Sequence, residues 1–211
     1  MKNVGLLVLI LLVAVCCPAQ QWEVGGGAGA GFIPGVPVSS PYGSATTGFQ
    51  TGPVFGAFFG QNLYRHLSGE AHYDFMISNQ KLVSGGTSAS FSGQAHMLHF
   101  DLLFHTNKSE SRAQFYAVVG GGMKIYVGTG TEEAYQPLSQ FGYFTKTRQL
   151  TPMGSVGGGV KLALSEKIFM RIEARDYITP FPTQIIAPAP GAKFGSLLHD
   201  IIPMVMISYE Y

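Results

Sequence analysis

The sequence predicts an all-β fold, an eight-stranded antiparallel up-and-down transmembrane β-barrel that is preceded by a cleaved signal peptide. Three observations lead to this prediction. The N-terminus has the layout of a secretory leader, eight later segments alternate between apolar and more polar residues, and the connections between them are alternately long and short. Short turns at one end and long loops at the other are typical of outer-membrane barrels.

The first 19 residues have the layout of a signal peptide. Lys2 supplies a positive charge, residues 4–17 form an uncharged apolar run, and Ala19 ends a short stretch of the kind that signal peptidase cleaves. The run is shorter than the about 20 apolar residues of a spanning helix. We therefore expect residues 1–19 to be removed and residues 20–211 to form one outer-membrane β-barrel domain.

Composition narrows the class of the mature chain. Both cysteines, Cys16 and Cys17, lie in the leader, so the remaining sequence offers no disulfide, thiol nucleophile or cysteine metal site. Only 12% of residues are charged, and no second apolar run is long enough for a spanning helix. The charged residues form no basic stripe, which excludes nucleic acid as an expected partner.

The eight expected strands share an apolar face that repeats every second residue. The last segment is the clearest, with isoleucine, proline, valine and tyrosine at its odd positions and serine and glutamate at the end of its even positions. The expected strands span residues 22–32, 47–59, 70–77, 97–105, 115–127, 155–162, 168–175 and 201–211.

The spacing of these segments gives the topology. Strands one, three, five and seven are followed by long connections, whereas the other connections are shorter, the tightest being residues 165–167. An even number of strands then places both termini on the periplasmic side. The expected outer loops span residues 33–46, 79–90, 128–149 and 179–199.

A soluble eight-stranded barrel is the alternative fold. Its interior would be apolar, so charged residues such as Asp101, Arg171 and Glu173 would be buried there at a large energetic cost. In a bilayer the apolar faces contact acyl chains, the charges pair inside, and closure satisfies every backbone group. We therefore expect a monomeric barrel in the bacterial outer membrane, with outer-membrane lipid around it.

Three segments resemble the OmpA/OmpX-like family of outer-membrane β-barrel proteins, and they read FYAVVGGGMKIYVG, IFMRIEARDYIT and HDIIPMVMISYEY. The resemblance covers nearly the whole mature chain and implies the barrel architecture. Members of the family serve as structural proteins, adhesins, small pores and, in a few cases, enzymes. The resemblance also implies that Tyr209 and Tyr211 belong to the terminal signal that the barrel-assembly machinery reads.

The lumen is the first place to look for a site. Inward-facing glycines on strands one, two, five and six are expected to leave space, and an eight-stranded barrel is just wide enough for side chains to fill it. We favour a plug of internal ion pairs over a narrow polar conduit. The expected lumen charge network consists of Glu70, Asp74, Asp101, Lys124, Lys161, Arg171, Glu173, Arg175 and Glu210.

Part of this network is expected at the periplasmic end. Lys161, Arg171 and Glu210 lie near the periplasmic ends of neighbouring expected strands. Each occupies a position of its strand that is expected to face inward. The carboxylates within reach of the two cations are Glu210, Glu173 and, from across the barrel, Glu70.

No catalytic, cofactor-binding or metal site is expected. The inward-facing His72, His99 and His105 are scattered, and no HExxH motif is present. A lipid A deacylase would need serine, histidine and carboxylate together, and no serine is evident beside His99 and Asp101. The sequence therefore favours a structural or cell-surface interaction role. The alternative is a small pore for hydrophobic or small polar solutes, and a lipid A-modifying enzyme is less favoured.

The outer loops are the second place to look. The loops over residues 128–149 and 179–199 are rich in aromatic residues and proline. If exposed they would bind a surface or a partner, and if packed together they would cover the mouth of the barrel. The sequence leaves both alternatives open and does not identify an extracellular partner.

Overall fold

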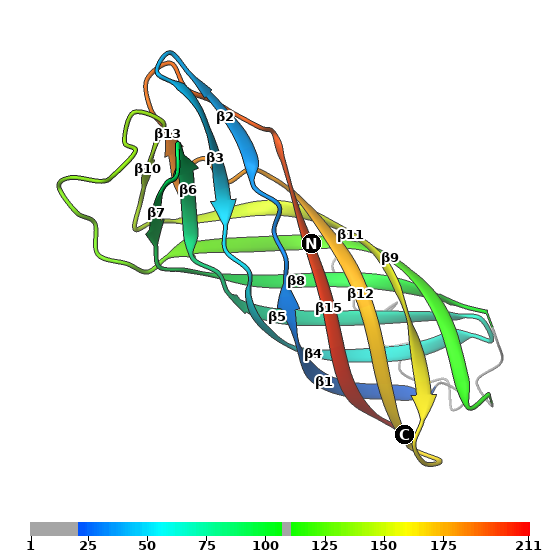
Figure 1. The fold of residues 1–211 in the computed structure, drawn as a ribbon. Coiled ribbons are helices and arrows are strands. Elements are labelled where there is room, and N and C mark those ends of the chain that lie inside the picture. The colour runs from blue at the N-terminus through cyan, green and yellow to red at the C-terminus, as the bar shows by residue number, and fades with distance from the viewer. Residues whose placement is uncertain (1–20, 107–110) are drawn as a thin grey trace, which may run out of the picture.

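The structure is a computed structural model that describes residues 21–106 and 111–211, so the expected signal peptide lies outside the described residues. Eight long antiparallel strands close into one barrel, in which β1 pairs with both β4 and β15 (Figure 1). Within the described ranges, no helix is long and apolar enough to cross a membrane. The barrel strands are β1 (Trp22–Gly31), β4 (Gly52–Tyr64), β5 (Leu67–Ile77), β8 (Gly93–His105), β9 (Ala113–Gly128), β11 (Arg148–Ala163), β12 (Ile168–Pro180) and β15 (Leu197–Glu210).

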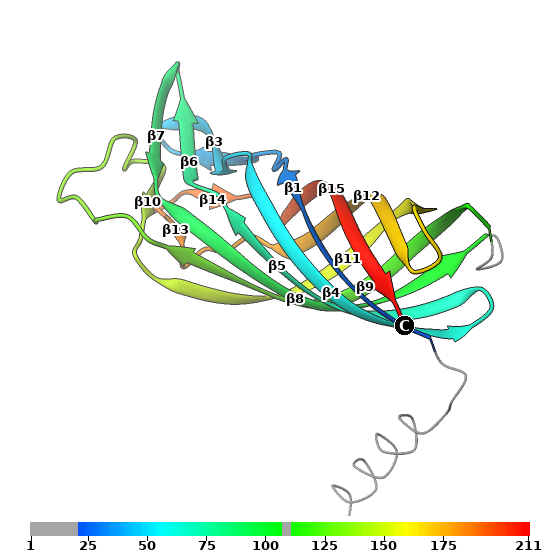
Figure 2. The same cartoon turned by 90° about the horizontal axis from the view of Figure 1, so that it is seen from below.

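The long connections at one end of the barrel form further β-structure, visible above the barrel in Figures 1 and 2. One sheet has the order β14-β2-β3-β6-β7, and β10 pairs with β13. The four long connections that the sequence predicts therefore contain seven further strands, which we call together the outer sheets. They are β2 (Val36–Ser40), β3 (Gly43–Phe49), β6 (Gln80–Ser84), β7 (Thr87–Phe91), β10 (Gly142–Phe144), β13 (Ile186–Pro188) and β14 (Lys193–Phe194).

One expected strand, residues 47–59, is divided between the two parts of the molecule. β3 ends at Phe49 in an outer sheet, and β4 begins at Gly52 in the barrel wall. The Gln50 N–H donates to the Asn79 carbonyl oxygen at 2.7 Å and fixes the corner between them. The buried positions are mainly odd-numbered in β3 and even-numbered in β4, so the alternation changes phase at this corner.

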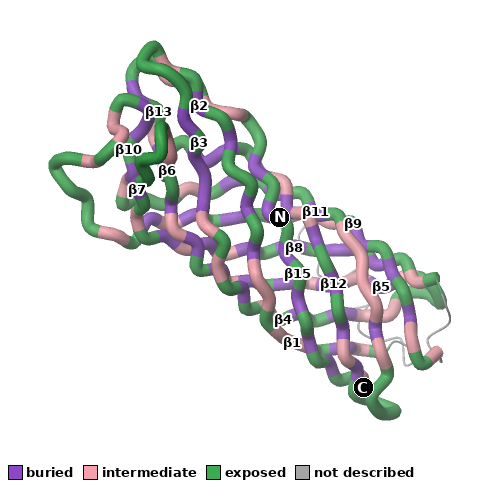
Figure 3. The backbone as a smooth tube through the Cα atoms, in the orientation of Figure 1, coloured by how far each residue is buried: buried purple, intermediate pink, exposed green. Residues whose placement is uncertain are grey.

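Burial alternates from residue to residue along the barrel strands, most regularly along β5, β8, β12 and β15 (Figure 3). Outward-facing Phe55, Phe100 and Phe115 are 51%, 66% and 58% exposed, whereas the inward-facing Arg171 is 1% exposed. A barrel with apolar side chains outside and charged side chains inside is suited to lipid rather than to water. The soluble alternative is thereby excluded.

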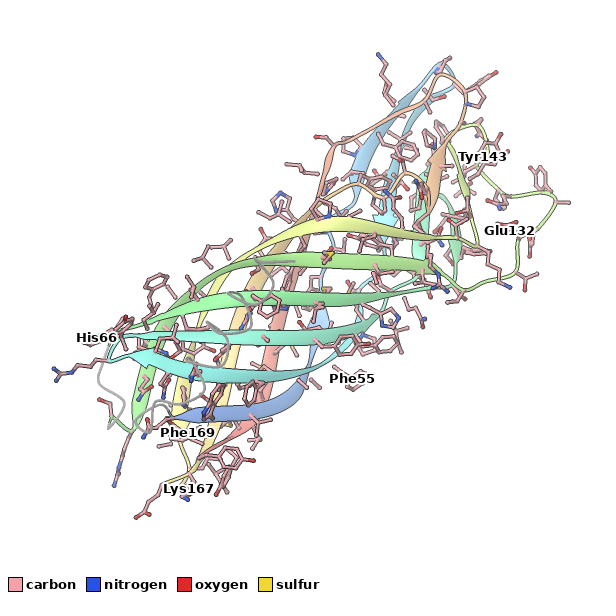
Figure 4. The ribbon with its side chains drawn as sticks, turned by 180° about the vertical axis from the view of Figure 1, so that it is seen from behind. Phe55, His66, Glu132, Tyr143, Lys167 and Phe169 are labelled. Carbon is pink, nitrogen blue, oxygen red and sulfur yellow. The ribbon has the colours of Figure 1, made fainter. Side chains whose placement is uncertain are left out.

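The two ends of the barrel differ. Figure 4 shows His66 and Lys167 at the end that holds the short turns, and Glu132 and Tyr143 at the end that carries the outer sheets. Both described termini lie at the first of these ends, where the backbone of Tyr211 bonds to that of Trp22. We call it the periplasmic end, and the opposite one the outer end.

Candidate functional site in the barrel lumen

The centre of the lumen holds a histidine between two carboxylates. His99 Nδ1 lies 2.7 Å from Asp101 Oδ2, and His99 Nε2 lies 3.0 Å from Asp74 Oδ2. The Tyr177 hydroxyl donates to Asp74 and the Ser155 hydroxyl donates to Asp101. A neutral imidazole has only one N–H donor. Two carboxylate partners therefore require a second proton, held either on the ring or on a carboxyl group.

Arg175 connects this centre to the next layer of charges. Its guanidinium donates to Asp101 and, at 3.1 Å, to Glu173, and it lies 3.2 Å from His72 Nε2. The same His72 nitrogen is 2.8 Å from Glu70 Oε2. Each of these five side chains is at most 5% exposed. Arg175 therefore joins groups from three strands within a space that water hardly reaches.

The periplasmic layer contains two further cations, Arg171 and Lys161. Arg171 donates to both oxygens of Glu70, at 2.7 and 3.2 Å, which is the forked geometry of a strong arginine–carboxylate pair. Lys161 Nζ lies 2.8 Å from Glu23 Oε2 and 3.3 Å from Glu210 Oε2. Arg171 also lies 3.8 Å from Glu23 Oε1, so the contacts run without a break from the barrel centre to its periplasmic end. We call the connected set the lumen network: Glu23, Glu70, His72, Asp74, His99, Asp101, Lys161, Arg171, Glu173, Arg175 and Glu210.

Glycines make room for these large side chains. Gly120 pairs with Asp101, Gly157 pairs with Arg175, and a Cβ added at either glycine would lie within 3 Å of its partner residue. The sequence predicts that these glycines leave empty space in the lumen. That space is instead filled by charged side chains from the neighbouring strand. The same register pairs Gly56 with Asp74, Gly60 with Glu70, Gly122 with His99 and Gly159 with Glu173.

The outer half of the lumen is mostly apolar. Its buried side chains belong to one hydrophobic cluster that continues into the outer sheets. Lys124 and Asp200 form an isolated ion pair there, beside the ring of Tyr126. The sequence predicts a polar inner face along the whole barrel, and this division differs from that prediction. The apolar lining includes Val54, Met76, Met97, Met153, Leu198, Ile202 and Met204.

The arrangement of donors does not favour a metal centre. His72, His99 and Asp101 bring one donor atom each within 4.8 Å of one another. However, both His99 nitrogens already face carboxylates, and the Arg175 guanidinium contacts both His72 and Asp101. A cation placed among these donors would lie against a permanent positive charge.

The same geometry does not resemble a serine hydrolase. No serine is evident beside His99 and Asp101 in the sequence, yet the fold brings Ser155 Oγ to 2.7 Å from Asp101 Oδ1. Its hydroxyl donates to the carboxylate and not to an imidazole. A nucleophilic serine needs a base that accepts its proton, oriented by a third group. Ser155 contacts the carboxylate of Asp101 and not the ring of His99, so the imidazole is not placed to accept the proton of the serine hydroxyl.

The structure places the predicted site residues as follows. Eight of the nine, all except Glu210, are at most 5% exposed and face inward, and the Glu210 side chain is 12% exposed. Lys124 stands apart from the other eight, because its partner is Asp200. Tyr209 and Tyr211 lie at the periplasmic end, where their rings pack edge to face with centroids 5.0 Å apart.

Several contributors are absent from the sequence-based set. Glu23 has the same parity as the inward glycines of β1 and is 6% exposed. Asp200 shares the parity of Glu210 on β15, so strict alternation would have found both. Glu173, expected as a partner of the periplasmic cations, instead bonds to Arg175 and to the Tyr116 hydroxyl. Which groups meet across the barrel depends on strand stagger, which the sequence pattern does not give.

The aromatic loops mainly pack against one another. Phe141, Phe144 and Ile185 are 3%, 5% and 0% exposed, within the cluster that fills the outer sheets. Tyr135 and Tyr143 remain 78% and 42% exposed at the outer end. Of the two alternatives that the sequence leaves open, packing over the barrel mouth accounts for most of these side chains.

Comparisons with known proteins support the same fold. No protein-family model matches the chain, and no curated protein matches its sequence. The outer membrane protein OprG of Pseudomonas aeruginosa superimposes with a TM-score of 0.58 at 11% identity, over 92% of this chain and 96% of that chain. Neisserial surface protein A gives 0.55 at 10% identity, over 90% and 97% of the two chains.

The N-terminal barrel domain of Pseudomonas aeruginosa OprF gives a TM-score of 0.50 at 12% identity, over 90% of this chain and 97% of that chain. At such identities the likeness concerns the fold and not what these proteins do. The outer-membrane location predicted from the sequence agrees with this fold and with the apolar exterior of the barrel. The chain has the closed eight-stranded β-barrel fold of these outer-membrane proteins, which is the architecture that the sequence predicts.

Proposed function

We propose that this protein is a closed outer-membrane barrel with a structural or cell-surface interaction role. In this proposal the lumen network plugs the barrel, and the barrel holds the outer sheets above the membrane as the part that meets the extracellular environment. The mature protein would be a monomer of residues 20–211. The observation that carries the proposal is the unbroken set of buried contacts from Asp74 to Glu210.

The energetics of this network favour a closed lumen. Opening a path would separate Arg171 from Glu70 and Arg175 from Asp101, and all four groups are at most 5% exposed. Leaving a buried charge without its partner costs roughly 3–5 kcal/mol. Two such separations would make an open state rare, so the proposed plug is a stable feature rather than a gate.

We expect the protein to show no stepwise ion conductance in planar lipid bilayers at neutral pH, because ions would have to displace paired charges. Insertion would be verified by the shift in gel mobility between unheated and heated samples, which folded barrels show. Regular single-channel steps from the folded protein would refute the plug and support the polar conduit.

A pore for hydrophobic solutes is the second candidate. The methionine-lined outer half of the lumen favours it, because flexible thioether side chains adapt to apolar molecules. Lipid vesicles that contain the protein would then take up a hydrophobic dye, whereas planar bilayers that contain it would show no ion conductance. Uptake equal to that of protein-free vesicles would leave the closed barrel as the better account.

We further propose that the protein is not an enzyme. The support comes from the contacts around His99. Each ring nitrogen of His99 lies against a carboxylate, and the Ser155 hydroxyl donates to Asp101 and not to the imidazole. A lipid A-modifying enzyme would also need its reactive group at the lipid-facing surface. These residues point into the lumen instead.

The terminal aromatic residues are proposed to guide insertion by the barrel-assembly machinery. Replacing Tyr211 with aspartate should lower the amount of folded barrel in the membrane fraction severalfold, because it puts a charge into the aromatic girdle of the last strand. A matched control is Tyr64→Asp at the periplasmic end of β4, since the two tyrosines are 69% and 78% exposed. Equal folded yields of the two variants would contradict a special role of the C-terminal strand.

A further inference from the structure

A groove of about 340 Å³ lies on the outside of the barrel near its periplasmic end. Its floor is β5, where two small residues face outward. Gly69 has no side chain, and Ala71 has a single methyl group. The strand register places Gly69 between Gln61 and Leu102, and Ala71 between Phe59 and Phe100. Two small residues thus lie between larger neighbours on both sides, which leaves a channel along the strand.

The walls of the groove are apolar. On one side, Trp22 stacks on Phe59 with ring centroids 4.8 Å apart, and Leu63 continues the wall toward the turn. On the other side, Phe100 and Leu102 are 66% and 44% exposed. Tryptophan is enriched where a membrane protein meets the interface between acyl chains and headgroups. The groove therefore lies at the depth where a lipid chain begins.

A cation stands beyond the periplasmic end of the groove. The turn between β4 and β5 consists of Arg65 and His66, both exposed. His66 Nδ1 lies 3.0 Å from the His105 carbonyl oxygen, which anchors the turn. Among the residues that the structure describes, Arg65 has no hydrogen-bond or ion-pair partner. Guanidinium groups bind phosphate through two parallel hydrogen bonds.

We propose that this groove binds one anionic glycerophospholipid from the inner leaflet of the outer membrane. An acyl chain lies over Gly69 and Ala71 between the two apolar walls, and the headgroup phosphate contacts Arg65. The proposal rests on the membrane orientation of the barrel, but not on whether the lumen is closed. A failure of this site would therefore leave the proposed plug untouched.

Trp22 is the only tryptophan of the chain and forms part of the groove wall, so its fluorescence reports on the site. The protein would be reconstituted into phosphatidylcholine vesicles that contain phosphatidylglycerol with brominated acyl chains. Bromine quenches tryptophan on contact. We expect half-maximal quenching at a mole fraction severalfold below that given by brominated phosphatidylcholine.

Two substitutions separate chain binding from headgroup binding. Ala71→Phe fills the floor and should raise the mole fraction for half-quenching to the value of random lipid mixing. Arg65→Gln should instead abolish the preference for phosphatidylglycerol over phosphatidylcholine while chain contact persists. If Ala71→Phe does not fold, Gly69→Leu fills the same floor from the next outward-facing position on β5.

The matched control is Ala174→Phe, an outward-facing alanine on β12, on the opposite side of the barrel. It adds the same side chain to the lipid-facing surface without touching the groove, so its quenching curve should match that of the wild type. If the wild type shows no headgroup preference, or if Ala71→Phe and Ala174→Phe give the same curve, Trp22 senses only general boundary lipid and the proposal fails.

Discussion

Replacing Arg175 with alanine is expected to destabilise the folded barrel by roughly 3–5 kcal/mol, the cost of leaving buried charges unpaired. Arg175 contacts Asp101, Glu173 and His72, and its removal would leave two carboxylates of 2% and 3% exposure without their main cation. The measurement is a urea titration of the protein in detergent micelles, with the folded fraction read from unheated gels.

Two further variants make this test specific. Arg148→Ala removes an exposed arginine at the outer end of β11 and should leave the urea midpoint unchanged. Arg175→Lys keeps the charge but loses the fork that reaches several acceptors at once, so it should fall between the wild type and Arg175→Ala. Equal midpoints for Arg175→Ala and Arg148→Ala would show that the lumen network does not stabilise the barrel.

The barrel could be predicted from the sequence because a strand that separates lipid from a lumen must alternate. The inward parity of Arg171 and the outward parity of Phe100 follow from that rule alone. Parity also assigns Glu23 and Asp200 to the lumen, although both lie outside the predicted charge network. Alternation therefore identifies interior residues even in segments that carry a single charge.

The outer sheets could not be predicted in the same way. β2 and β3 are short and rich in serine, threonine and glycine, so their alternation resembles that of an ordinary loop. Their stability comes from a cluster shared with distant segments, such as Leu82 and Ile185, each 0% exposed. Strands that exist because of long-range packing leave little trace in a local sequence window.

The partners inside the lumen were also beyond sequence reasoning. Arg171 and Glu70 lie 101 positions apart and meet across the barrel. Whether two inward side chains reach the same level depends on the tilt and stagger of all the strands between them. The sequence does encode one neighbouring relation, because glycines occur directly opposite several of the buried charged side chains. Gly120 opposite Asp101 is the example with the closest approach.

Gly120→Ala should therefore destabilise the barrel by about 1–3 kcal/mol, the usual cost of forcing an extra carbon into a packed interior. A Cβ at this position would lie 1.8 Å from Asp101 Oδ1 and 2.5 Å from the Phe100 carbonyl oxygen. The carboxylate cannot move freely, since Arg175, His99 and Ser155 all donate to it or lie beside it. The backbone oxygen is fixed by the barrel wall.

The same substitution at Gly154 provides the control, because a Cβ there would have no atom within 4 Å. Gly154→Ala faces lipid and should be neutral or slightly stabilising, since alanine restricts the unfolded chain more than glycine does. Urea midpoints of the two variants, measured side by side, isolate the space opposite Asp101 from the general effect of adding a methyl group. A Gly120→Ala barrel as stable as Gly154→Ala would mean that Asp101 shifts at no cost, and that the glycine is not there to accommodate the network.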